Sequence, residues 1–149
     1  IYAEMLRLLE EARIQAFWIP HDSPPSRGDE TTEPHAAVLD GRPGSDTLTV
    51  IAHQEIEYCA SLPYRRQPLD IQLWLGRLGG ASLEVFYEVY SPEGIQPRVL
   101  YTRAATTIVL VDAHTQRPRK ISDQERAAWS PYCDDPLIFR SGLRQKKEL

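Results

Sequence analysis

Two adjacent glutamates near the start of the chain, Glu10 and Glu11, are the side chains best placed for acid–base chemistry. Residues 1–19 have helical spacing, and one flank of the expected helix is apolar except at Glu10: Ala3, Leu6, Glu10, Ile14 and Phe17. Burying a carboxylate is costly unless it is paired, protonated or functional. Glu10 is therefore a candidate general base or nucleophile. The alternative is that it lies at a solvated boundary between packed elements, or forms an ion pair with Arg7 or Arg13.

A second face of the same helix is apolar along its whole length: Ile1, Met5, Leu8, Leu9, Ala12 and Ala16. A helix that is apolar on two flanks is expected to be covered by other structure on both. Glu11 gathers with Glu4 and Arg7 on the remaining, polar face, and is the second candidate carboxylate.

Other chemistry has weaker support in the sequence. Ser82 has no His/Asp pattern near it that would make a serine triad, and Cys59 has no histidine at a recognisable spacing, which favours a small apolar filler. Cys59 and Cys133 are far apart, and none of the histidines shows ligand spacing: His21, His35, His53 and His114. We expect no metal site and a reduced, cytoplasmic protein.

Length and charge set limits on the class of protein. A chain of 149 residues fits one domain with a real core, and a net charge of -4 gives no indication of nucleic acid as a partner. No apolar run reaches the roughly 18 residues of a membrane span. Because the sequence begins at Ile1, already within a helical pattern, we expect an N-terminal strand to be missing upstream.

Four strands are expected after the helix. Residues 20–46 are rich in Pro, Gly, Ser, Asp and Glu and predict a long loop, which could act as a lid or have no role. Period-two alternation then predicts strands at 47–61, 70–78, 81–90 and 99–111. The first should have one buried face, formed by Val50, Ala52, Ile56 and Tyr58, and the nearly continuous apolar run at 108–111 should lie at the sheet centre.

A short second helix and a tail complete the chain. Ser122 to Glu125 resembles a capping box that opens a helix ending near Trp129, and residues 130–149 form a tail that could drape over the surface. One long helix is the element available to cover a four-stranded antiparallel sheet. We therefore predict an α+β fold in which a curved antiparallel sheet is wrapped around one long central helix.

Four segments, in the same order, resemble the hydroxybenzoyl-CoA thioesterase-like family of hot-dog proteins. They are Leu8-Leu9-Glu10-Glu11-Ala12-Arg13, His53–Tyr58 with Leu62-Pro63-Tyr64, Leu78–Val85, and Val111-Asp112 before Arg117-Pro118-Arg119. The resemblance implies a homodimer, possibly a tetramer, with active sites at the subunit boundary that hydrolyse acyl-CoA or acyl-carrier-protein thioesters in lipid metabolism. No cofactor is implied, since coenzyme A is part of the substrate.

The resemblance also implies roles for particular residues. Glu10 matches the carboxylate that one branch of the family carries in its central helix, while backbone N–H groups at the helix start polarise the thioester carbonyl. Another branch uses an aspartate before the helix, which would precede Ile1. Tyr2 could bind substrate, and cations that could hold coenzyme A phosphates are Arg65, Arg66, Arg117, Arg119 and Lys120.

Two rival functions stay open. A hydratase or dehydratase on the same scaffold would need a carboxylate–histidine pair, for which His53 has no partner in the expected order. A hot-dog module that binds acyl thioesters without catalysis is the second rival.

Overall fold

The computed structural model describes residues 2–18, 37–39, 44–63 and 68–140, and for Tyr2 and Ala3 it describes the backbone alone. Two α-helices and four strands follow in the order α1 (Tyr2–Phe17), β1 (Thr47–Tyr58), β2 (Asp70–Leu78), β3 (Ser82–Tyr90), β4 (Leu100–Asp112) and α2 (Asp123–Trp129). A short 3₁₀ turn, Ser130–Tyr132, follows α2. The predicted elements are thus confirmed to within a few residues at each end. Most of the predicted loop 20–46 lies outside the described residues.

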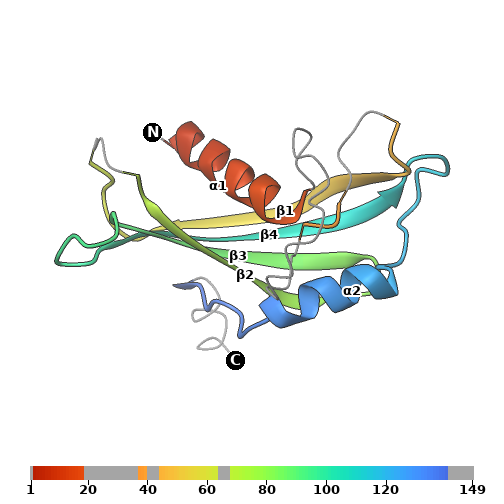
Figure 1. The fold of residues 1–149 in the computed structure, drawn as a ribbon. Helices are drawn as coiled ribbons and strands as arrows, with labels where there is room; N and C mark the ends of the chain where they lie inside the picture. The colour runs from red at the N-terminus through yellow and green to blue at the C-terminus, as the bar shows by residue number, and fades with distance from the viewer. Residues whose placement is uncertain (1, 19–36, 40–43, 64–67, 141–149) are drawn as a thin grey trace, which may run out of the picture.

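The strands form one antiparallel sheet in the order β1-β4-β3-β2 (Figure 1). The apolar run at the end of β4 lies between β1 and β3, as expected for an inner strand. The two edges of the sheet are therefore β1 and β2. No helix in the described part of the chain is long and apolar enough to cross a membrane.

Helix α1 packs on one face of the sheet through a line of side chains one turn apart, which comprises Met5, Leu9, Arg13 and Phe17. Beneath them lie alternate residues of the central strands: Leu83, Val85, Tyr87 and Val89 of β3, in register with Ile108, Thr106, Ala104 and Thr102 of β4. Fully burying each large apolar side chain stabilises the fold by about 1.5–3 kcal/mol. This helix–sheet layer is the core of the molecule.

The prediction that α1 is covered on both flanks within one chain is wrong. Leu6 is 43% exposed, Ile14 is 45% exposed, and Glu10 is exposed between them. The physical reason is the width of the covered sector, because Glu10 lies about 100° around the axis from Leu9, beyond the reach of the sheet. Phe17 is buried because it meets Trp129 of α2 edge-to-face, with ring centroids 6.4 Å apart.

The predicted buried face of β1 is right at Ile56, which packs against the core, and wrong at Val50. The register between β1 and β4 shifts between Ile51 and His53, so Ile51 shares the α1 side of the sheet with Ile56 while Val50 points to the other side. Val50 is 49% exposed and Ile51 is 42% exposed. The bulge reverses the sides of the residues before it, and the faces of β1 are covered only in its second half, where Ile56 packs on the core and Glu57 meets Arg140 of the strap.

The opposite face of the sheet is crossed by residues 133–140, which we call the C-terminal strap (Figure 1). The strap begins beside β2, where Asp134 N–H donates to the Leu75 carbonyl and the Trp74 indole donates to the Asp135 carbonyl. It ends at β1, where Arg140 N–H donates to Glu57. The predicted draping of the tail is confirmed for this described portion.

Gly76 allows aromatic side chains to pack closely on the face of the sheet that the C-terminal strap crosses. A Cβ on Gly76 would clash with the ring of Phe86, which is 4% exposed and packs against Trp74. Gly76→Ala is therefore expected to lower the free energy of unfolding by about 1–3 kcal/mol, measured by urea titration. Gly80→Ala is the matched control, because nothing lies within 4 Å of the added methyl. Equal losses in both variants would contradict this account of the packing.

Candidate active site

The two candidate glutamates lie about 100° apart around α1, with Glu11 on the exposed face that points away from the sheet. Ala12, Gln15 and Ala16 line a groove against β2, so the flank that carries Leu6, Glu10 and Ile14 is turned toward the β1 edge of the sheet. No hydrogen bond or ion pair joins Glu10 to any residue that the structure describes. The expected alternative partners are used elsewhere: Arg7 lies 3.7 Å from Glu4 and Arg13 donates to Tyr87.

The surface around Glu10 continues onto β1. On the side of β1 that faces α1, Ile51 is 42% exposed and Tyr58 is 44% exposed. We call Leu6, Glu10 and Ile14 together with Ile51 and Tyr58 the β1-side surface. Its side chains are mainly apolar, although the exposed Gln54 lies between Ile51 and Tyr58 on the same side of β1. The surface borders the backbone edge of β1, which pairs with no other described strand.

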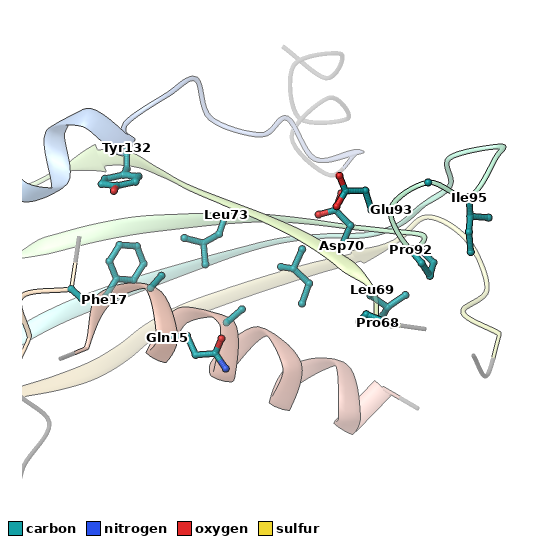
Figure 2. A pocket seen from close by; sticks show the side chains of 15 residues that line it. Gln15, Phe17, Pro68, Leu69, Asp70, Leu73, Pro92, Glu93, Ile95 and Tyr132 are labelled. Atoms are coloured by element: carbon teal, nitrogen blue, oxygen red, sulfur yellow. The ribbon is translucent and has the colours of Figure 1, made fainter. Parts of the chain in front are cut away.

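Glu11 is exposed and does not itself line the groove between α1 and β2 that Figure 2 shows. Its carboxylate accepts a hydrogen bond of 3.5 Å from Gln15, which lines the groove. The groove has a volume of about 1120 Å³, and its walls are largely apolar: Ala12, Ala16, Phe17, Leu69, Ile71 and Leu73. Asp70 and Glu93 lie at one end (Figure 2), and Asp70 pairs with Arg98 at 3.1 Å.

A smaller cavity of about 470 Å³ lies near the start of α1. It is lined by Met5, by the segment from Tyr58 to Leu62 after β1, and by the buried Thr102. The first turn of a helix has backbone N–H groups without partners inside the helix, together with a positive potential. This end of α1 could therefore stabilise a developing oxyanion. Tyr2 begins α1, but its side chain lies outside the description.

The predicted phosphate-binding cations divide into three groups. Arg65 and Arg66 lie outside the described residues. Arg117 and Lys120 are exposed in the segment that follows β4. Arg119 is already engaged: it donates twice to Glu125 at 2.7 and 2.8 Å and once to the Thr47 hydroxyl at 2.7 Å. Phosphate binding by these residues stays a prediction. Arg119 could bind phosphate only by giving up its hydrogen bonds to Glu125 and Thr47.

The Arg119–Glu125 clamp ties α2 to the start of β1. Glu125 also completes the predicted capping box, accepting from Ser122 N–H at 2.9 Å while Ser122 Oγ accepts from Glu125 N–H at 3.1 Å. Burial acts to raise the pKa of Glu125, but the hydrogen bonds from Arg119 and Ser122 outweigh it and hold that pKa below its ordinary value.

Sequence reasoning missed one buried polar pair. Arg13 is 5% exposed, and its Nη1 donates to the hydroxyl of Tyr87, which is 0% exposed, at 3.0 Å. The signal was present, since Arg13 stands one turn from both Leu9 and Phe17, on the line that faces the sheet. It was assigned instead as a possible partner of Glu10.

A single long helix packed on a curved antiparallel sheet defines the hot-dog class of proteins. The sequence model of the thioesterase-like superfamily matches residues 2–129 of this chain, so the chain belongs to that superfamily. A comparison with curated protein sequences finds no match.

Solved structures with the same fold agree with this assignment. The PA2801 protein of Pseudomonas aeruginosa is 22% identical, with a TM-score of 0.59, over 86% of this chain and 82% of its own. A predicted thioesterase from Bacillus stearothermophilus is 24% identical, with a TM-score of 0.52, over 60% and 62%. The SAV2348 protein of Staphylococcus aureus, solved in complex with CoA, is 13% identical, with a TM-score of 0.52, over 62% and 56%. The chain thus spans less than two thirds of the length of the last two.

The clamp makes stability depend on pH. Because the pKa of Glu125 is lowered in the folded state, its stabilisation is present above the ordinary value of 4.5 and is lost as the pH falls through the lowered value. Glu125→Gln should lower the free energy of unfolding by about 2–3 kcal/mol at pH 7 and flatten its fall below pH 4.5.

Urea unfolding measured between pH 7 and pH 3 provides the check. Glu4→Gln is the matched control, because the Glu4–Arg7 pair is largely exposed and should contribute little. An acid-dependent fall as steep in Glu125→Gln as in the unaltered protein would contradict the assignment.

Proposed function

We propose that this protein is an acyl-thioester hydrolase that acts as a homodimer joined along β1, with Glu10 as general base at the subunit boundary. One observation carries the proposal: the flank of α1 that bears Glu10 is largely apolar, is exposed, and lies on the same side as the edge of β1 that pairs with no other described strand. The superfamily assignment supplies the class of reaction.

A second copy of the chain is the occupant that best fits the β1 edge. β1 is 12 residues long, and large apolar side chains are exposed on both its faces: Leu48, Val50, Ile51 and Tyr58. A long apolar edge strand invites pairing with another strand, and a two-fold axis places the same surface on both partners. Such pairing would bring both copies of the β1-side surface to one boundary and would remove Glu10 from bulk water.

The chemistry then needs only groups that this boundary can supply. Glu10 takes a proton from a water molecule while the water oxygen attacks the thioester carbonyl carbon. The carbonyl oxygen becomes an oxyanion, which the N–H groups at the start of α1 would stabilise. The C–S bond then breaks, the thiolate leaves and is protonated, and the products are a free acid and a thiol.

The thiol carrier and the acyl group are less constrained. The CoA complex of the structurally similar SAV2348 protein supports a CoA carrier. The α1–β2 groove has room for an acyl chain, but it lies on the flank opposite Glu10. Glu11 does not line that groove but accepts a hydrogen bond from Gln15, which does, and it is the competing candidate base. Both cysteines are free, which fits a cytoplasmic location.

The proposed base is tested by replacing each glutamate separately. Glu10→Gln should lower kcat for thioester hydrolysis by about 10²–10⁴-fold, because the amide cannot accept the water proton. Glu11→Gln is the matched control and should retain activity. Release of free thiol from short, long and aromatic acyl-CoA esters measures the rate.

Each alternative result identifies a different failure. Loss of activity in Glu11→Gln alone would identify Glu11, and not Glu10, as the base. Thioester binding without thiol release by the unaltered protein would favour the non-catalytic binding module, whereas addition of water to an unsaturated acyl group would indicate a hydratase.

The proposed dimer is tested at β1. Val50→Lys places a charge on the exposed strand but outside the β1-side surface, so it should convert dimers to monomers and reduce hydrolysis through assembly alone. Sedimentation velocity measures the oligomeric state. Ile138→Lys is the control, since Ile138 is 58% exposed on the C-terminal strap, away from β1. Dimers that survive Val50→Lys, or an unaltered protein that is monomeric, would refute this interface.

A further inference from the structure

We propose that Arg13 and Tyr87 form a positioning pair that fixes the rotation of α1 about its own axis and thereby aims Glu10 at the subunit boundary. The functional half of this inference rests on the proposed hydrolase; the structural half, a fixed rotation of the helix, stands independently.

The pair lies in the centre of the helix–sheet interface. Tyr87 is in the middle of β3, where it is in register with Ala104 of β4 and Leu73 of β2. Arg13 is on the line of α1 that faces the sheet, and its Nη1 donates to the Tyr87 hydroxyl at 3.0 Å. The small side chain of Ala104 beside Tyr87 leaves room for the long arginine side chain beneath the helix.

Stability alone does not account for an arginine at this place. A guanidinium keeps its positive charge in proteins and offers five N–H donors. Within the described residues, Arg13 makes one hydrogen bond, to a neutral phenol, and no ion pair, although it is 5% exposed. Burying a charge without an opposite charge is costly, and a buried polar group can instead fix which of several packings is adopted.

At its C-terminal end α1 is held by Leu39 N–H, which donates to the Phe17 carbonyl at 3.0 Å, and by the edge-to-face contact of Phe17 with Trp129. Nearer to Glu10, the sheet-facing side chains of Met5 and Leu9 are apolar. Apolar packing has no preferred direction, so these two side chains hold the helix on the sheet but allow a roll about its axis. A hydrogen bond weakens steeply away from its preferred geometry, so the Arg13–Tyr87 bond resists such a roll.

Rotation of α1 determines where Glu10 points. Glu10 precedes Arg13 by three residues, which places it about 60° around the helix axis. A small roll would therefore carry its carboxylate along the β1-side surface. A displacement of about 1 Å at a reacting group can cost about 10²-fold in rate.

The test removes both partners together. In Arg13→Met/Tyr87→Phe the buried polar groups are replaced by apolar groups of similar size, so no orphaned donor or acceptor is left. The midpoint of urea unfolding should be unchanged or higher, while kcat for thioester hydrolysis falls by about 10-fold or more and KM changes by less than about 3-fold. Arg13→Lys in the otherwise unaltered protein should retain part of kcat, because lysine keeps a donor for the Tyr87 hydroxyl.

Two kinetic results would overturn the proposal. Full kcat in the double variant would show that the pair does not position the base. A shifted pH profile of kcat, with a normal rate at its new optimum, would assign Arg13 a direct electrostatic effect on the reacting groups instead of a positioning role.

A readout without substrate separates this inference from the proposed function. Spin labels on Glu10→Cys and Leu48→Cys, in a chain with Cys59→Ala and Cys133→Ala and diluted with unlabelled protein, report the position of α1 over β1 by pulsed electron paramagnetic resonance. The distance distribution should be narrow with the native pair and broader in the Arg13→Met/Tyr87→Phe background. Equal widths would overturn the inference even if the protein hydrolyses thioesters, and a broadened distribution would support it even if it does not.

Discussion

The packing of α1 on one face of a four-stranded sheet is the constraint on which the rest of this structure depends. Met5, Leu9 and Phe17 face inward, and the sheet covers only the sector of the helix that they occupy. Every other sector must be polar, be covered by something else, or remain apolar and open. The flank with Leu6 and Ile14 is apolar and open. An exposed apolar stripe on a helix that already has a buried face indicates a second contact surface.

The exposed flank of α1 lies beside β1, an edge strand of the sheet that the structure describes. Because β1 is an edge strand with a register shift at its middle, its apolar side chains project on both sides and none of them is fully covered. Ile51 and Tyr58 extend the apolar flank of α1 toward the strand's backbone edge. A carboxylate in the middle of such a surface is solvated in one chain and would be sheltered in a pair. In the proposed dimer, the same residues would determine both the assembly and the environment of the proposed base.

The sequence predicted elements well where the signal was local. The capping box of Ser122 and Glu125 and the bounds of β2 depend on neighbouring residues, and both are confirmed. Burial of Glu10 and of one face of β1 depended on knowing which element covers which side, and periodicity cannot supply that. The bulge near Ala52 reversed the expected sides of Val50 and Ile51. The α+β hot-dog class followed from the order of elements and from a family resemblance, whereas the roles of the site residues stay predictions.

Arginine usage illustrates why charge patterns in a sequence are weak guides to function. Arg119, in a basic cluster that suggested phosphate binding, holds Glu125 at 2.7 Å and anchors α2. Arg13, next to two glutamates, pairs with neither and reaches a tyrosine on β3. In both cases the partner is set by the fold and not by neighbours in the sequence. Arg119 pairs with an opposite charge and stabilises the fold. Arg13 makes a directional hydrogen bond to a neutral phenol, and this bond orients the helix that carries the candidate base.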